Sequence, residues 1–227
     1  MTMMYRVLAR SILLAFLTAA LYAIGCTHRI DKFSPLNYFP LQLNNTWIFN
    51  GEIHTMKVTD AAKIGHERYI TLTFYDSLDV ALWSEKYHVV KDQLRWLSFE
   101  PATSLLPRVT FNPPLYGAPF SKEPGDTDSI SSIETQTDST ETTTAITVDY
   151  QIQAVEDVET PAGKFPGCIK MKINFIYPTS ALRPLFIGEH YWWFSPTAGP
   201  VKYDLPTAFG ELVKLDLNLS LFSSAGS

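Results

Sequence analysis

The stretch AITVDYQIQAV, residues 145–155, indicates the fold class, because apolar and polar side chains alternate along it. Ile146, Val148 and Tyr150 share one face, and polar residues occupy the positions between them. A period of two is the pattern of a β-strand with one dry and one wet face. We therefore expect an extended strand that contributes one face to a hydrophobic core.

The same alternation recurs towards the carboxy terminus, in residues 168–177 and most clearly in residues 213–221. One-sided alternation is typical of antiparallel sheets, whereas parallel sheets covered by helices show continuous apolar runs. Beyond the amino-terminal segment, the only candidate for a helical period is a weak one at Thr179–Phe186. The sequence therefore predicts a mainly antiparallel β domain. Further strands are expected at Thr46–Val58, Glu67–Phe74, Val80–Val90, Gln93–Phe99, Glu189–Phe194 and Val201–Asp204.

A turn is predicted at Thr160-Pro161-Ala162-Gly163, between two of the clearest strands. Proline presets φ for the second position of a tight turn, and glycine suits the fourth position. We therefore expect a hairpin that joins the strands at residues 145–155 and 168–177.

The segment Glu100–Gly125 contains six prolines interleaved with large apolar residues. So many prolines argue against a central strand or a helix interior. The segment is too apolar for a free linker, so we expect a long proline-rich loop that packs across a sheet face or an open barrel end. It would either cover the core or act as a lid over an apolar ligand. The candidate ligand-facing residues are Leu105, Leu106, Phe111, Leu115, Tyr116 and Phe120.

The following segment, Asp126–Thr144, is rich in Ser, Thr, Asp and Glu and has few large apolar residues. Its β-branched threonines allow extended strands that are wet on both faces, in a hairpin that turns near Asp138-Ser139. Disorder is the alternative, because so polar a segment buries too little to offset its chain entropy.

Residues 1–25 have the layout of a secretory signal, in which Arg6 and Arg10 precede an uncharged apolar stretch. That stretch is shorter than the roughly 20 residues that a membrane-spanning helix needs. It ends in Ala23-Ile24-Gly25-Cys26, which resembles the lipobox of bacterial lipoproteins. The resemblance implies cleavage between Gly25 and Cys26 and attachment of lipid to Cys26, with an ordinary cleaved signal as the alternative.

Several acyl chains on one cysteine make a lasting anchor, because a single chain binds a membrane only marginally. Thr27 follows the cysteine, where Asp would act as a retention signal for the inner membrane. We therefore expect an exported protein, most simply on the periplasmic face of the outer membrane. The expected parts are a signal peptide at 1–25, a lipid-anchored tether at 26–45, a single antiparallel β domain at 46–221 and a tail at 222–227.

The net charge limits which classes of molecule the protein can bind, and the cysteine count limits disulfide formation. The formal net charge is −5, and removal of residues 1–25, which hold two Arg and no acid, takes it to −7. A nucleic-acid partner would need a basic stripe, so none is expected. Membrane attachment is left to the lipid rather than to a polybasic surface. If Cys26 is acylated, Cys168 has no intramolecular partner, and we interpret it as a structural cysteine.

The sequence offers no recognisable catalytic motif. The histidines are scattered, without the spacing of a metal site, and no nucleophile elbow or phosphate-binding glycine loop is present. We expect no metal and no cofactor. His190 shares a strand face with Trp192 and Phe194, where a histidine is usually packed or hydrogen-bonded.

Three segments together resemble uncharacterised exported bacterial lipoproteins. Residues 38–47 resemble their opening motif YFPLxxGNTW, with Asn44 in place of the usual glycine. Residues 158–168 resemble a central hairpin with TPAGxFxxC, and residues 191–203 resemble a closing motif that ends in GxVKY. The resemblance implies a curved antiparallel sheet, related to the open half-barrels of lipoprotein-carrier proteins, and supplies no catalytic residues.

Three functions remain open. We favour a non-enzymatic, lipid-anchored envelope protein whose β domain binds an apolar ligand, such as a lipid, or another envelope component. The alternative is a structural or assembly lipoprotein without a small-molecule ligand. An envelope hydrolase would need titratable groups from separate strands to converge in one pocket.

Overall fold

The computed structural model describes residues 33–50, 53–91, 93–103, 107–137, 141–176, 188–196, 198–206 and 212–221, the last ten and residues 205–206 by their backbone only. These residues all belong to one unit, Phe33–Ser227. A 3₁₀ helix, η1, spans Pro35–Tyr38. The strands are β1 Thr46–Asn50, β2 Thr55–Ile64, β3 Glu67–Tyr75, β4 Ala81–Val90, β5 Gln93–Pro101, β6 Arg108–Tyr116, β7 Thr127–Thr137, β8 Thr142–Thr160, β9 Gly163–Ile176, β10 Gly188–Ser195, β11 Gly199–Pro206 and β12 Leu212–Leu221.

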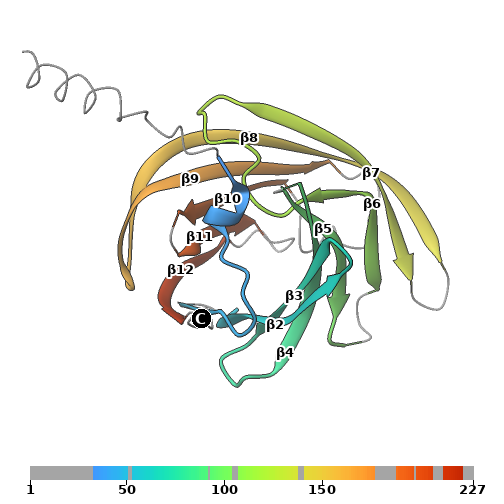
Figure 1. The fold of residues 1–227 in the computed structure, drawn as a ribbon, viewed down its shortest axis with the longest axis horizontal. Helices are drawn as coiled ribbons and strands as arrows, with labels where there is room; N and C mark the ends of the chain where they lie inside the picture. The colour runs from blue at the N-terminus through green and yellow to red at the C-terminus, as the bar shows by residue number, and fades with distance from the viewer. Residues whose placement is uncertain are drawn as a thin grey trace, which may run out of the picture. The chain divides into compact units, whose positions relative to one another are not determined.

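Each strand pairs antiparallel with its neighbours in the chain, so the prediction of a mainly β domain built on a curved antiparallel sheet is confirmed. The curvature goes further than that of an open half-barrel. Strand β1 pairs with β2 on one side and with β12 on the other, which closes the sheet into a barrel. The two longest strands, β8 and β9, lie side by side (Figure 1).

The alternation read from the sequence is confirmed on β8, β9 and β10. Ile146, Val148 and Tyr150 of β8 are buried, and β9 and β10 show the same inward faces. The predicted hairpin is also present, because Thr160 pairs with Gly163 across the turn. Gly163 has a φ of 130°, a conformation that side chains disfavour.

The strand expected at Thr46–Val58 is in fact two strands, β1 and β2, which pair with each other. Before them, Asn44 has a φ of 71°. Asparagine is one of the few residues with a side chain that adopts this left-handed conformation readily.

The expectation of a continuous loop over Glu100–Gly125 is wrong for its middle part, which forms β6 between β5 and β7. The prolines are accommodated by a break in the ladder. Strand β6 pairs with β5 at Val109 and Thr110 and again at Leu115 and Tyr116, with a register shift between the two pairs. Pro113 and Pro114 lie in this irregular stretch, where the missing proline N–H groups break no ladder bond.

For the polar segment Asp126–Thr144 we expected either a hairpin or disorder. The segment forms the hairpin, in which Gln136 pairs with Thr142. The expectation that both faces would be wet is wrong. Ser132, Glu134 and Gln136 are at most 8% exposed and share the inward face of β7. Gln136 Nε2 donates to Glu134 Oε1 at 2.7 Å, so part of this polar content is satisfied inside the fold.

The second half of the expected tether belongs to the β unit. Phe39 and Leu41 are 2% and 3% exposed. The Phe39 ring contacts Trp47, Tyr87 and Phe194, with ring centroids 5.6–6.4 Å apart. Apolar surface of this size gains free energy when it leaves water, even without a regular secondary structure to present it. Phe39 and Leu41 therefore pack into the interior of the closed sheet, while Asn37 and residues 42–44 stay exposed.

Several expectations lie outside the described residues. They are the signal and lipid attachment site with Gly25 and Cys26, the weak helix candidate at Thr179–Phe186, the turn at Asp138-Ser139 and the tail at 222–227. Among the residues that the structure describes, no helix is long and apolar enough to span a membrane.

Gly117, just after β6, lies against the ring of Tyr87. Its N–H donates to the Leu94 carbonyl oxygen at 3.0 Å, and an added β-carbon would lie 2.6 Å from Tyr87 Cδ1. Tyr87 is buried, so its ring cannot move without disturbing its neighbours. We expect Gly117→Ala to lower the free energy of unfolding by about 1–3 kcal/mol, measured by urea denaturation.

The control for this prediction is the same substitution in a Tyr87→Leu background, which removes the ring. Alanine at position 117 should cost much less there, because the two changes share one contact. An equal cost in both backgrounds would show that Tyr87 is not the cause.

Candidate ligand-binding pocket

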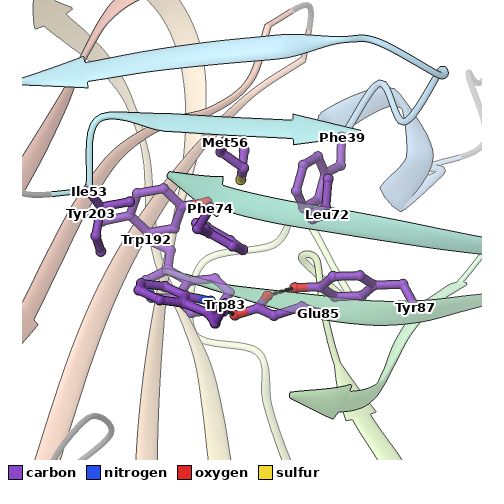
Figure 2. A pocket seen from close by; sticks show the side chains of 10 residues that line it. All are labelled: Phe39, Ile53, Met56, Leu72, Phe74, Trp83, Glu85, Tyr87, Trp192 and Tyr203. Carbon is purple, nitrogen blue, oxygen red and sulfur yellow. Dashed lines mark hydrogen bonds between the residues drawn. The ribbon is translucent and has the colours of Figure 1, made fainter. Parts of the chain in front are cut away.

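An aromatic pocket lies inside the closed sheet, where β2, β3 and β4 face β10 and β11 (Figure 2). Its cavity volume is about 50 Å³. This is room for a few water molecules or a group of similar size, and far less than the several hundred Å³ of a pocket for a drug-sized ligand. The lining residues are Phe39, Ile53, Met56, Leu72, Phe74, Trp83, Glu85, Tyr87, Trp192 and Tyr203.

Most of the lining side chains lie on the inward face of their strands, because successive side chains of a strand point to opposite faces of the sheet. Trp83, Glu85 and Tyr87 occupy every second position of β4 and therefore point to the same side of the sheet. The Trp83 ring stacks on Phe74 of β3, with centroids 4.7 Å apart. Across the pocket, Trp192 and Tyr203 meet edge to face at 5.4 Å. These contacts hold the rings in place around the cavity.

The pocket opens at one side, as the exposure of its lining residues shows. Ile53, Phe74 and Trp83 are partly exposed, whereas Met56 and Leu72 are fully buried. The mouth is therefore formed by Ile53 and the stacked pair of Phe74 and Trp83. The deeper wall is aliphatic and aromatic.

Glu85 is the one acidic residue in the described lining, and it is only 7% exposed. Trp83 Nε1 donates to its Oε1 at 3.2 Å, and the Tyr87 hydroxyl donates to its Oε2. Figure 2 shows the carboxyl group between these two side chains. Both hydrogen bonds come from the strand that carries Glu85, so the position of the carboxyl is fixed locally.

Burial raises the pKa of Glu85 to about 7, and the hydrogen bonds from Tyr87 and Trp83 offset part of that rise. Burial also raises the pKa of Tyr203, and the nearby charge of Glu85 adds to the effect. The tyrosine therefore stays neutral, while Glu85 gains or loses its proton near neutral pH. A titratable group perturbed by burial inside a pocket marks a candidate functional site.

One further polar group in the pocket wall lacks a partner. Within the described part of the chain, Trp192 Nε1 is buried and has no hydrogen-bond acceptor. A buried donor in this state costs roughly 1–3 kcal/mol. A water molecule or a ligand atom that accepts from it would recover that free energy.

The described residues among those predicted to face a ligand lie elsewhere in the fold. Leu105 and Leu106 fall outside the described residues. Phe111 and Leu115 are buried on β6, and the Phe111 ring packs on Trp96 at 4.9 Å. Neither Phe111 nor Leu115 lines the pocket.

The other two candidates, Tyr116 and Phe120, stack on each other at 5.3 Å, and both contact Tyr150. They are not part of the pocket lining either. The segment therefore covers and fills the core in the described region, and the pocket is formed by other strands.

The histidines that the structure describes do not converge on a site. His88 stacks on Tyr69 at 4.5 Å and lies 3.5 Å from the Glu67 carboxylate. His190 is fully buried and packs on Phe175 at 5.2 Å, on the strand face expected for it. Among the described residues, no three His, Cys, Asp or Glu side chains are placed to hold a metal ion.

Cys168 is a buried free cysteine whose Sγ–H donates to the Phe165 carbonyl oxygen at 3.3 Å. Burial raises the pKa of its thiol to about 12, with the charges of Asp157 and Glu156 adding to the rise. Since the thiolate is the reactive form, this thiol is inert at neutral pH.

The sequence held a signal for Glu85 that the search for catalytic motifs missed. In the predicted strand Val80–Val90, alternation places Glu85 on the same face as Trp83 and Tyr87. An acid between two aromatic residues on an inward face is unusual, because charged groups are rarely buried without a partner. The pocket itself needs rings from other strands, which no local pattern reveals.

No protein-family model and no curated protein matches the chain. Two solved structures are similar to it, each over 81% of this chain and 98% of the other. One is of a Parabacteroides distasonis protein described as a lipoprotein, with 15% identity and a TM-score of 0.49. The other is of a Bacteroides fragilis protein described as exported and YmcC-like in fold, with 19% identity and a TM-score of 0.49. Likeness at this level carries no inference about this chain.

Proposed function

We propose that the chain is an exported, lipid-anchored envelope protein whose β unit binds an apolar ligand group in the pocket around Glu85. The observation that supports the binding role is a cavity of about 50 Å³ with aromatic walls, a buried carboxyl group and an indole N–H without a partner among the described residues. Protein interiors are close-packed, so a cavity that also presents polar groups is a candidate place for a small ligand group.

The export and the anchor are supported by the sequence alone. The two arginines, the apolar stretch and Gly25-Cys26 have the order of a lipoprotein signal. In the proposed protein, acylated Cys26 holds the chain on the periplasmic face of the outer membrane. Only six residues separate Cys26 from Phe33, where the described β unit begins.

The cavity size limits what is bound. At about 50 Å³ the pocket takes one small group, such as the end of a slender molecule, rather than a whole lipid. The partly exposed mouth at Ile53, Phe74 and Trp83 gives the rest of such a ligand a way out to solvent.

One observation favours the assembly alternative. The pairing of β6 with β7 ends at Asn112 and Ile133, whereas β7 continues to Thr127. A groove of about 580 Å³ lies along this opening, with Pro113, Pro114 and residues 129–131 in its wall. Sheet edges that lack a partner can pair with a strand from another protein.

Native mass spectrometry of the full-length protein, extracted from membranes in dodecyl maltoside, tests the proposal. We expect a small molecule bound in equal stoichiometry. Ile53→Trp fills the mouth and should abolish it, whereas Ile64→Trp, at a residue 66% exposed on β2, should not. If Ile53→Trp retains the ligand, the pocket is not the binding site. The proposal is also overturned if the wild-type protein carries no small molecule and instead carries a stoichiometric protein partner.

A further inference from the structure

The pocket combines a carboxyl group with aromatic rings, and this combination has a chemical preference. Each Glu85 oxygen accepts one hydrogen bond, from Trp83 or Tyr87. An ionised carboxylate has about four acceptor positions, so about two remain for a donor from a ligand. Among the described lining residues there is no Lys, Arg or His to fill them.

Aromatic faces attract cations as well as apolar groups, because the ring face carries partial negative charge. The same attraction occurs elsewhere in the described part of this protein. Lys170 Nζ lies 4.9 Å from the centre of the Trp193 ring, and the guanidinium carbon of Arg95 lies 4.2 Å from the centre of the Tyr116 ring. In the pocket, the rings of Phe74, Trp83 and Tyr203 border a cavity instead of a protein cation.

We propose that the pocket binds an alkylammonium group, with the Glu85 carboxylate as its counter-ion and the surrounding rings against its methyl or methylene groups. This inference rests on the proposed binding function and names the class of ligand. The cavity of about 50 Å³ suits a group of a few heavy atoms. A primary amine and a quaternary ammonium group share this chemistry, and matched probes distinguish them.

Cation binding in this pocket should depend on pH. Burial raises the pKa of Glu85 to about 7, so below neutral pH the empty pocket holds a neutral acid. A bound cation favours the carboxylate, so binding releases a proton when the pH is low. The other titratable groups in the described lining are the hydroxyls of Tyr87 and Tyr203, whose pKa values burial raises. Affinity for a cation should therefore rise with pH through about 7 and then level off.

Calorimetric titration of the full-length protein in dodecyl maltoside, at constant ionic strength, tests this with two matched pairs of probes. Tetramethylammonium is compared with tert-butanol, and n-butylammonium with n-butanol, because each pair has nearly the same shape and differs in charge. We expect at least one cation to bind at least about tenfold more tightly than its alcohol at pH 8. Its affinity should fall about tenfold between pH 8 and pH 6, while that of the alcohol stays constant.

The variant Glu85→Gln keeps the size of the side chain and removes its charge. In it, the cation should lose its preference over the alcohol and its dependence on pH. Equal binding of cations and alcohols to the wild type, unchanged by Glu85→Gln, would overturn the inference and leave an apolar pocket as proposed above. Binding of none of the four probes would overturn both. The pH dependence in the wild type does not rely on the folding of any variant.

Discussion

Replacing Glu85 with glutamine is expected to raise the free energy of unfolding by about 3 kcal/mol at pH 8 and to leave it nearly unchanged at pH 4. The pKa of Glu85 is raised from its ordinary value of 4.5 to about 7 by burial. Below pH 4.5 the acid is protonated in the folded and the unfolded chain. As the pH rises towards 7, only the unfolded chain ionises, so the folded state loses relative stability. A neutral glutamine avoids this loss.

Urea denaturation of both proteins at pH 4, 6 and 8 measures the effect. The difference in the free energy of unfolding between Glu85→Gln and the wild type should grow between pH 4 and pH 7 and stay constant above pH 7. Glu189→Gln is the matched control. Hydrogen bonds from Lys172 and Tyr191 lower the pKa of exposed Glu189, so its removal should not stabilise the fold at pH 8. Parallel pH profiles for the wild type and Glu85→Gln would mean that Glu85 is not held in an unfavourable charged state.

Replacing Cys26 with alanine should abolish acylation completely. Cells grown with an alkyne analogue of palmitate should label the wild-type protein and not the variant, because lipid attachment needs the Cys26 sulfur. The remaining cysteine cannot substitute for it, since Cys168 is buried and burial raises its pKa to about 12. The measurement is labelling of the purified protein, together with the mass of its amino-terminal peptide.

Cys168→Ala provides the control for this prediction, because it removes the other sulfur and should leave labelling intact. A Cys26→Ala protein that still carries the label would place the lipid elsewhere. A wild-type protein that lacks the label and begins at another residue would indicate an ordinary cleaved signal instead of a lipoprotein signal.

Much of the sheet could be predicted because, in a strand with one buried face, the alternation of apolar and polar residues shows which side chains are buried. Strands β3, β4, β5 and β8 to β11 lie where period-two alternation placed them, and the turn at Thr160–Gly163 follows from its proline and glycine. His190 is buried on the predicted face. In each case the information is contained in about ten neighbouring residues.

The differences arise where contacts distant in the sequence decide the structure. Strand β6 exists despite Pro113 and Pro114 because the ladder is interrupted beside them. Phe39 and Leu41 have no strand pattern, yet the closed sheet gives them an interior to occupy. The pairing of β1 with β12 joins the two ends of the β unit, and no local periodicity reports on it.

The candidate site was predictable only in part. A ligand-binding β unit was expected, with Phe111, Leu115, Tyr116 and Phe120 among its ligand-facing residues, whereas the pocket that we propose surrounds Glu85. Apolar residues among prolines look like a lid, and in the structure those four pack on other side chains. The pocket needs Phe39, Glu85 and Trp192 together, and they come from three separate regions of the chain.

The central claim is that one ionisable carboxyl group lies inside an aromatic pocket and titrates near neutral pH. Nuclear magnetic resonance of the ¹³C-labelled glutamate carboxyl groups, followed from pH 3 to pH 9, tests this most directly. We predict one carboxyl signal with a pKa of about 7, absent from Glu85→Gln. If every glutamate carboxyl of the wild-type protein titrates below about pH 5, the Glu85 carboxyl is solvated and the account is contradicted.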